Sequence, residues 1–122
     1  MNTSPDDAFS KLAVDHWRLI RVLARLVDRL PPASQARVAA QARFALSQLD
    51  SLVMDQGLSL VTFDGRAFDP SLPVTAVNAD DFIGASALLV SETVEPTVMA
   101  EGRVIQLGKV LVSQGEVDAS RN

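Results

Sequence analysis

Few residues in this chain have the types and spacing that catalysis requires. The sequence holds a single histidine, His16, and no cysteine, so neither a zinc site nor a thiolate nucleophile is expected. A Ser-His-Asp triad would have to use His16, and the sequence contains no nucleophile-elbow motif. We therefore predict that the protein is not an enzyme and that His16 is a packed or partly exposed imidazole.

Four aspartates in the second half, Asp64, Asp69, Asp80 and Asp81, could supply oxygen ligands to a hard cation. Their spacing does not match an EF-hand, and each of them has a turn or capping role open to it. The six glycines are scattered at turns and form no phosphate-binding loop. We predict neither a metal site nor a cofactor.

Length, composition and charge limit the size of the fold and the kinds of partner that the protein can bind. The 122 residues suffice for one domain or two small lobes, and the net charge of −4 disfavours nucleic acid as a partner. The opening MNTSPDDAF lacks the basic and apolar regions of a signal peptide, and no apolar run has the length of a membrane span. A cytoplasmic protein that binds neither nucleic acid nor membrane is the expectation.

Apolar residues recur at helical spacing as far as Gly57, which predicts a helical hairpin. A first helix is expected over Pro5–Leu30, with Ser4 as its N-cap, and Pro31-Pro32 ends it. A second helix is expected over Gln35–Gln56, with Ser34 as its N-cap. Gly57 is expected at the C′ position, followed by Leu58 as the hydrophobic partner that such a helix end often carries.

The first helix has two faces that call for a contact. Arginines with spacings of three and four form one face, which is either solvated or a contact surface for an acidic partner: Arg18, Arg21, Arg25 and Arg29. The apolar face is too wide for a two-stranded coiled coil, so either the second half of the chain or a second copy must cover it. We predict a homodimer in which two hairpins form a four-helix bundle through Ile20, Leu23, Val27 and Leu49, with Trp17 in the core or at the bundle interface.

After Gly57 the apolar residues form short runs, rich in β-branched types, that are separated by turn residues. Asp64-Gly65 indicates a hairpin or tight turn, Asn78–Phe82 a capped turn or one helical turn, and Gly108 a bulge. The predicted strands are Leu58–Phe63, Pro73–Val77, Ala87–Val94, Thr97–Ala100, Arg103–Gln106 and Lys109–Val112. The predicted fold class is α+β: a hairpin over residues 1–57, a small all-β head over residues 58–113, and a flexible tail over residues 114–122.

Two runs in the head occur in a recognisable order. Gly65-Arg66-Ala67-Phe68-Asp69-Pro70 follows a helix, a glycine and a short strand, and Arg103–Val112 follows a turn. This order resembles the GrpE family of nucleotide-exchange factors for DnaK-type chaperones, in which G-x-x-F-D-P comes early in the head and R-V-L-R-P-A-x-V-x-V closes it. The chain departs from the family at three motifs: Pro73-Val74-Thr75 replaces His-Glu-Ala, Thr97-Val98 replaces Gly-Tyr, and Gln106-Leu107-Gly108 replaces Arg-Pro-Ala.

The resemblance implies a homodimeric co-chaperone without covalent chemistry. In the family, one head binds the nucleotide-binding domain of the chaperone in its open state and thereby weakens nucleotide affinity. Family contact positions fall on Val94, Arg103 and Val112, although both valines could equally be strand core residues. Phe68, Asp69 and Pro70 match the F-D-P of the family motif and are the other candidate contacts, although the phenylalanine and the proline could instead shape the loop and pack beneath it. The alternative function is an adaptor that keeps the fold and binds a different protein, which the loss of the His-Glu-Ala and Arg-Pro-Ala motifs favours.

Overall fold

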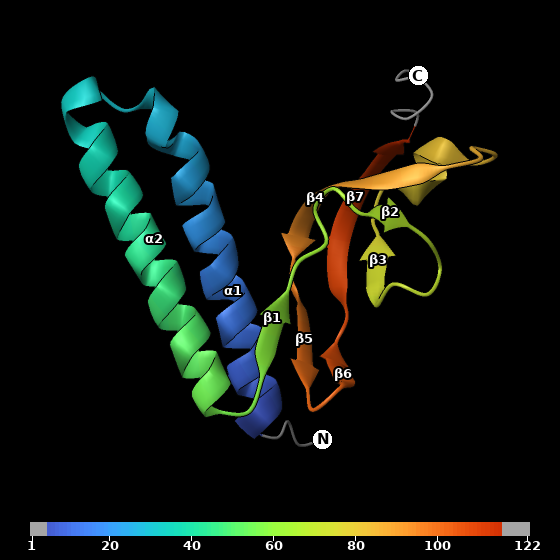
Figure 1. Cartoon of the computed structure of the whole chain (residues 1–122), viewed down its shortest axis with the longest axis horizontal. Coiled ribbons are helices and arrows are strands. Elements are labelled where there is room, and N and C mark those ends of the chain that lie inside the picture. Colours follow the sequence, from blue (N-terminus) through green and yellow to red (C-terminus); the bar gives the residue numbers. More distant parts are fainter. Residues whose placement is uncertain (1–4, 116–122) are drawn as a thin grey trace.

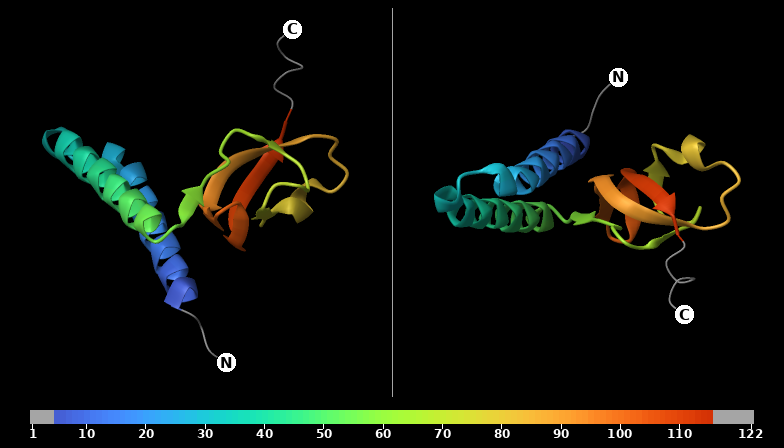
Figure 2. Two further views of the ribbon diagram at one scale, coloured as in Figure 1. Left: turned by 60° about the horizontal axis from the view of Figure 1, so that its bottom comes forward. Right: turned by 90° about the horizontal axis from the view of Figure 1, so that it is seen from above.

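The computed structural model describes residues 5–115 and has an α+β fold made of a helical hairpin and a β-sheet head. Figure 1 shows the two parts meeting beside β1 and diverging from there, so that the gap between them widens toward the α1–α2 turn. The two views in Figure 2 show that neither part is inserted into the other. The predicted order, a helical hairpin followed by a β-head, is therefore confirmed.

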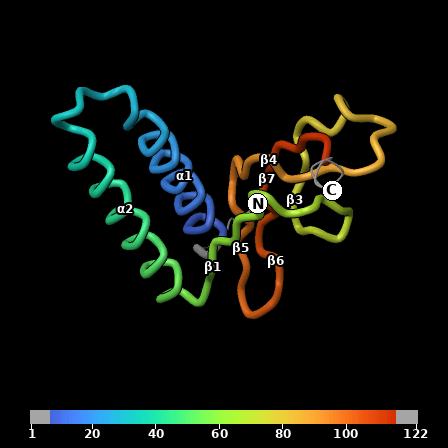
Figure 3. The backbone as a smooth tube through the Cα atoms, turned by 45° about the horizontal axis from the view of Figure 1, so that its top comes forward, coloured from blue at the N-terminus to red at the C-terminus, as the bar shows by residue number. Residues whose placement is uncertain are grey.

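The hairpin consists of α1 (Pro5–Leu26), the 3-10 turn η1 (Val27–Arg29) and α2 (Pro32–Asp55). The tube in Figure 3 traces the tight reversal between the two helices. The predicted first helix is α-helical only to Leu26 and ends as the 3-10 turn η1, and the prediction that Ser34 caps α2 is wrong. The predicted N-cap Ser4 lies outside the described residues. α2 begins earlier because Pro32 suits the first helical position, where no amide hydrogen is needed.

The reversal between the helices is held by Gln35. Its side-chain amide donates a hydrogen bond to the carbonyl oxygen of Leu30 at 3.0 Å and a longer one to that of Asp28 at 3.4 Å. These carbonyls follow the end of α1 and have no helical partners. The Gln35 side chain of α2 thus provides hydrogen bonds to backbone carbonyl groups that follow the end of α1.

The end of α2 is the one the sequence predicts. Gly57 has a φ of +76°, its amide donates to the carbonyl of Met54 at 2.9 Å, and the amide of Leu58 donates to that of Val53 at 3.0 Å. This pair of bonds is the Schellman motif, and the buried side chain of Leu58 supplies the hydrophobic contact that accompanies it. The motif turns the chain directly into the first strand.

The head contains two sheets (Figure 1). A three-stranded antiparallel sheet has the order β1-β5-β6, with β1 at Ser59–Val61, β5 at Thr97–Ala100 and β6 at Arg103–Gln106. A four-stranded sheet has the order β2-β4-β7-β3, with β2 at Ala67–Phe68, β4 at Leu88–Glu95, β7 at Gly108–Gln114 and β3 at Val74–Ala76. In this sheet β3 pairs with β7 in parallel and the other pairs are antiparallel, while the 3-10 turn η2 (Ala79–Phe82) follows β3.

In the head, the predicted strand bounds and turns agree with the structure better than the expected hairpin pairing does. β5 and β6 have the predicted bounds, and Asp64-Gly65 is a turn. This turn does not form a hairpin, however, because β1 and β2 belong to different sheets. β7 extends to Gln114, the first residue of the predicted tail, and residues 116–122 of that tail lie outside the described residues.

Two clusters of buried side chains form the interior of the protein. The first lies between the hairpin and the three-stranded sheet and combines Ala13, Val14, Trp17 and Ile20 of α1 with Ala42, Leu49 and Val53 of α2, and with Leu58 and Val98. The second lies within the head and is built on Phe63, Val90, Val110 and Val112. The head therefore covers one apolar face of the hairpin. This is the first of the two covers that the sequence left open, the other being a second copy of the chain.

The chain passes between the two sheets at one crowded point. Gly108 donates its amide hydrogen to the Thr97 hydroxyl oxygen at 3.1 Å, and that hydroxyl donates to the carbonyl of Pro73 at 2.7 Å. A β-carbon on Gly108 would lie 2.6 Å from the carbonyl oxygen of Glu95 and 2.8 Å from the backbone nitrogen of Thr97. The glycine predicted as a bulge instead begins β7, where only a residue without a side chain fits.

Candidate partner-binding surfaces

The two valines expected to contact a partner lie in or near the interior of the head. Val112 is only 2% exposed, belongs to the head core and pairs with Val90 across β4 and β7. Its backbone exchanges two hydrogen bonds with the Asn78 side chain, of 2.9 and 3.0 Å. The Val112 side chain is thus unavailable to a partner in this structure, and Val94 is half-buried in β4. The sequence left Val112 as either a partner contact or a core residue of its strand. Its burial supports the second interpretation.

The Phe68-Asp69-Pro70 run contains the last residue of β2 and the start of the turn that follows it. Phe68 is half-buried and packs against the head core, while Asp69 and Pro70 are exposed. The Asp69 carboxylate accepts hydrogen bonds from the hydroxyl and the backbone amide of Ser71, the latter at 2.7 Å. These bonds hold the pKa of Asp69 below its usual value. Asp69 therefore shapes the turn, in agreement with a loop-forming role for this run.

The structure does not bring the predicted contact residues into one patch. Phe68 pairs with Leu88 at the start of β4, whereas Arg103 pairs with Ala100 on the β5–β6 hairpin, which follows the end of β4. β4 alone spans about 23 Å at roughly 3.3 Å per residue. Figure 1 accordingly shows β2 and β6 at different ends of the head. A single partner surface cannot be centred on both.

Arg103 instead lies beside two exposed apolar residues that the sequence did not single out. β6 is one of the two outer strands of the three-stranded sheet and is paired on one side only, with β5, among the described residues. Val104 is 43% exposed and Leu107, immediately after β6, is 52% exposed. We call Arg103, Val104 and Leu107 the head edge; it combines one positive charge, apolar surface and free backbone groups, as strand-adding or partner-binding edges do.

Ile83 is an exposed apolar residue of the head outside the head edge. It is 85% exposed, directly after η2 and before Gly84, whose φ is +89°. The turn predicted over Asn78–Phe82 ends one residue before Ile83, and a large apolar side chain directly before a glycine is the signal that could have identified it. Ile83 is distinct from the head edge, so the two can be tested against each other.

The arginine face of α1 does meet acidic groups, and they belong to the head of the same chain. Arg18 lies 3.4 Å from Glu95, Arg21 lies 3.3 Å from Asp64, and Arg25 lies 2.5 Å from Glu92. The arginine side chains are a third to a half exposed, so each pair contributes at most about 1 kcal/mol. Together the pairs orient the hairpin and the head, and among these three arginines none is left for an external acidic partner.

Asp64 connects this ion-pair row to the head. Its carboxylate accepts a hydrogen bond from the Thr93 backbone amide at 3.0 Å, while the buried Thr93 hydroxyl accepts one from the amide of Phe63. Burial raises the pKa of Asp64, but the hydrogen bonds from Thr93 and the charge of Arg21 outweigh it and lower the pKa below 3.8. The ionised form is therefore stabilised by folding.

Replacing Asp64 with asparagine is expected to destabilise the protein most near neutral pH. A lowered folded-state pKa gives stability that is present above the ordinary value of 3.8 and lost as pH falls through the folded value. Urea unfolding at about pH 7 and about pH 2.5 should therefore show a gap between parent and variant that shrinks at acid pH. Asp50→Asn, on the exposed surface of α2, controls for the loss of one charge. A gap of constant size would contradict the linkage.

Three of the four residues predicted for the dimer interface are buried within one chain. Ile20 and Leu49 belong to the cluster shared by hairpin and head, Val27 is buried at the α1–α2 turn, and Leu23 alone is exposed. Another row on α1, with spacings of 7, 4 and 3, is exposed instead. We call this row the outer stripe: Leu12, Leu19, Leu23 and Leu26.

The outer stripe lies away from the head. Trp17, Arg18 and Arg21 of α1 face the head, and helical spacing puts Leu19 and Leu26 on the other side.

A small groove of about 210 Å³ beside the stripe is lined by Leu12, the exposed His16, and Leu52 of α2, together with Phe9, Ala13 and Leu49. His16 thus lies at the edge of an apolar surface.

Two further findings concern the described part of the chain. Within residues 5–115, no three histidine, aspartate or glutamate side chains gather closely enough to hold a metal ion. Neither α1 nor α2 has the length and apolar content that crossing a membrane demands, and the same holds for every other helix in the described range.

The arrangement defines a class rather than a family: an α+β protein with a helical hairpin, a two-sheet head and exposed apolar surface on both. Comparisons with family models, with curated proteins and with solved structures find no match to this chain.

Proposed function

We propose that the protein is a GrpE-like co-chaperone that binds the nucleotide-binding domain of a DnaK-type chaperone through the head edge and promotes ADP release. The observation that carries the proposal is that Arg103, the arginine of the motif resemblance, is exposed on an outer strand next to exposed Val104 and Leu107. Binding the open state more tightly than the closed state is sufficient for exchange, so no catalytic group is required.

The proposal includes a homodimer in which two hairpins pack through their outer stripes. Four leucines exposed along one helix face are more apolar surface than a solvated helix usually shows. Because the stripe faces away from the head, dimerisation leaves the head edge of each copy open. This arrangement keeps the four-helix bundle expected from the sequence but replaces Ile20, Val27 and Leu49 as its contacts.

The direct test is release of a fluorescent ADP analogue from a DnaK-type chaperone with and without this protein. Acceleration that saturates at micromolar protein is expected, together with complex formation that ATP reverses. Absence of both would remove the co-chaperone proposal. Binding without acceleration would favour the adaptor, the alternative to which the replacements Pro73-Val74-Thr75 and Gln106-Leu107-Gly108 point.

Val104→Asp is expected to weaken binding to the chaperone about tenfold or more, because it places a carboxylate in the apolar part of the contact. The fold should be unaffected, since Val104 is 43% exposed on an outer strand. The measurement is a titration of labelled protein with the chaperone. Ile83→Asp is the matched control on an exposed apolar residue of the head that lies outside the head edge. If Ile83→Asp weakens binding and Val104→Asp does not, the contact lies on the η2 loop and the head-edge assignment is wrong.

A further inference from the structure

A cavity of about 510 Å³ lies on the head-facing side of the hairpin and is separate from both the outer stripe and the head edge. Its walls come from α1, α2 and the segment after β1, and they are mainly apolar: Trp17, Ile20, Ala24, Val27, Ala39, Ala42 and Leu46, with Thr62 below and with Arg21, Asp28 and Arg43. Its volume lies within the usual range for small-molecule sites, roughly 300–1,000 Å³.

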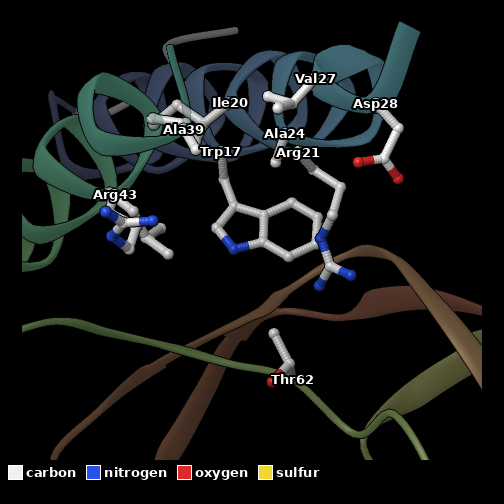
Figure 4. Close-up of a pocket in the computed structure, with 11 residues that line it drawn as sticks. Trp17, Ile20, Arg21, Ala24, Val27, Asp28, Ala39, Arg43 and Thr62 are labelled. Atoms are coloured by element: carbon white, nitrogen blue, oxygen red, sulfur yellow. The ribbon is translucent and has the colours of Figure 1, made fainter. Parts of the chain in front are cut away.

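Figure 4 shows how the polar groups are distributed. The Trp17 indole is central, Arg43 of α2 lies at one end, and Asp28 lies at the other. The Arg21 guanidinium lies 4.4 Å from the centre of the Trp17 ring and 3.3 Å from Asp64. Arg21 therefore fixes the indole, while its own charge is already compensated by a carboxylate.

Arg43 is the positive group that remains. Its side chain is exposed and forms no ion pair with any residue in the range 5–115. A guanidinium without a partner at the mouth of an apolar cavity suits a carboxylate, which it can bind with two parallel hydrogen bonds. At the other end the Asp28 carboxylate would repel an anion, so the charges give a ligand one preferred direction.

We propose that this cavity binds a small amphipathic carboxylate, with its anionic group at Arg43 and its apolar body against Trp17 and Ile20. The ligand would bridge α1 and α2 in the space between hairpin and head. This site goes beyond the proposed co-chaperone function and does not depend on it.

The protein carries its own reporter for the site, because Trp17 is the only tryptophan in the sequence and lines the cavity. Titration with octanoate should change Trp17 fluorescence in a saturable way. Octylammonium, of the same length and opposite charge, should bind at least about tenfold more weakly, as a charge-assisted hydrogen bond implies. Absence of a saturable change at millimolar octanoate, or equal binding of the two probes, would overturn the proposal.

Variants separate this site from adventitious binding to the apolar surface. Arg43→Ala should weaken octanoate binding about tenfold and leave the affinity for uncharged 1-octanol unchanged. Arg37→Ala removes another exposed arginine of α2 that does not line the cavity, and it should behave like the parent. Ala24→Leu adds volume at a lining position that is exposed in the free protein, and it should weaken octanoate and octanol together. Equal losses in Arg43→Ala and Arg37→Ala would contradict the placement of the carboxylate.

Discussion

Gly108→Ala is expected to destabilise the folded protein by about 3 kcal/mol and to lower its melting temperature by about 10 °C. The added methyl group would lie 2.6 Å from the Glu95 carbonyl oxygen and 2.7 and 2.8 Å from the hydroxyl oxygen and backbone nitrogen of Thr97. Two of these three atoms belong to the backbone, so the clash cannot be relieved by a side-chain rotation. The strands themselves must separate.

The expected cost is large because the crowded atoms also form the link between the two sheets. The Thr97 hydroxyl accepts the Gly108 amide and donates to the Pro73 carbonyl, and Thr97 itself is fully buried. Moving Gly108 away from Thr97 lengthens these hydrogen bonds. The polar groups involved then become exposed to solvent or stay buried without a hydrogen-bond partner. A steric clash and a lost hydrogen-bond link thus act at one position.

Thermal and urea unfolding followed by circular dichroism would measure the effect, with Gly84→Ala as the matched control. Gly84 has a φ of +89°, and a β-carbon there would meet no atom within 4 Å. Its substitution should therefore cost only the backbone strain of a left-handed residue, about 1–2 kcal/mol. Equal destabilisation by the two substitutions would show that close approach at Gly108 is not the cause.

The sequence predicts best where the determining contacts are local. Gly57 at the end of α2, and strands β5 and β6 around the turn at residues 101–102, follow from residue types within a few positions of one another. The pairing of β3 with β7, which joins Val74 to Gly108 across 34 residues, has no local signal. Gly108, predicted as a bulge, instead meets the backbone of Thr97, which lies 11 positions earlier and in the other sheet, so this close approach has no local signal either.

Burial in the candidate site was predictable only in part, because apolar residues occur on both sides of the same elements. α1 carries one apolar row that the head covers, including Ala13 and Ile20, and a second row that it leaves exposed, including Leu19 and Leu26. Spacing identifies both rows but cannot say which one the chain covers itself. The arginine face was equally ambiguous until the head placed Glu92 and Glu95 opposite it.

These two rows give the hairpin separate roles on its two sides. The head-facing side is occupied by the shared core, the ion pairs of Arg18, Arg21 and Arg25, and the cavity at Trp17. The other side has no such cover within the described chain, and its apolar content is what a second copy would bury. The proposed dimer would therefore depend on residues that contribute little to the fold of one chain.

Leu19→Asp is accordingly expected to convert the proposed dimer into a folded monomer, weakening self-association about thirtyfold or more, as loss of an interface hot spot does. Leu19 is 67% exposed in the single chain, so the substitution leaves the core intact and costs the fold only the low helix propensity of aspartate. Its neighbour provides the contrast. Ile20 is 7% exposed within the shared core, so Ile20→Asp buries a carboxylate and should unfold or severely destabilise the chain.

Sedimentation velocity across a range of concentrations, combined with thermal unfolding, distinguishes these two outcomes. Leu107→Asp, on the head edge, removes an exposed leucine of similar accessibility and should retain the dimer mass. A parent protein that sediments as a monomer at all concentrations would remove the dimer. A Leu19→Asp variant that keeps the dimer mass would place the interface elsewhere than the outer stripe. Only a monomeric, cooperatively folding Leu19→Asp variant fits a helix whose two apolar rows have different partners, one within the chain and one in a second copy.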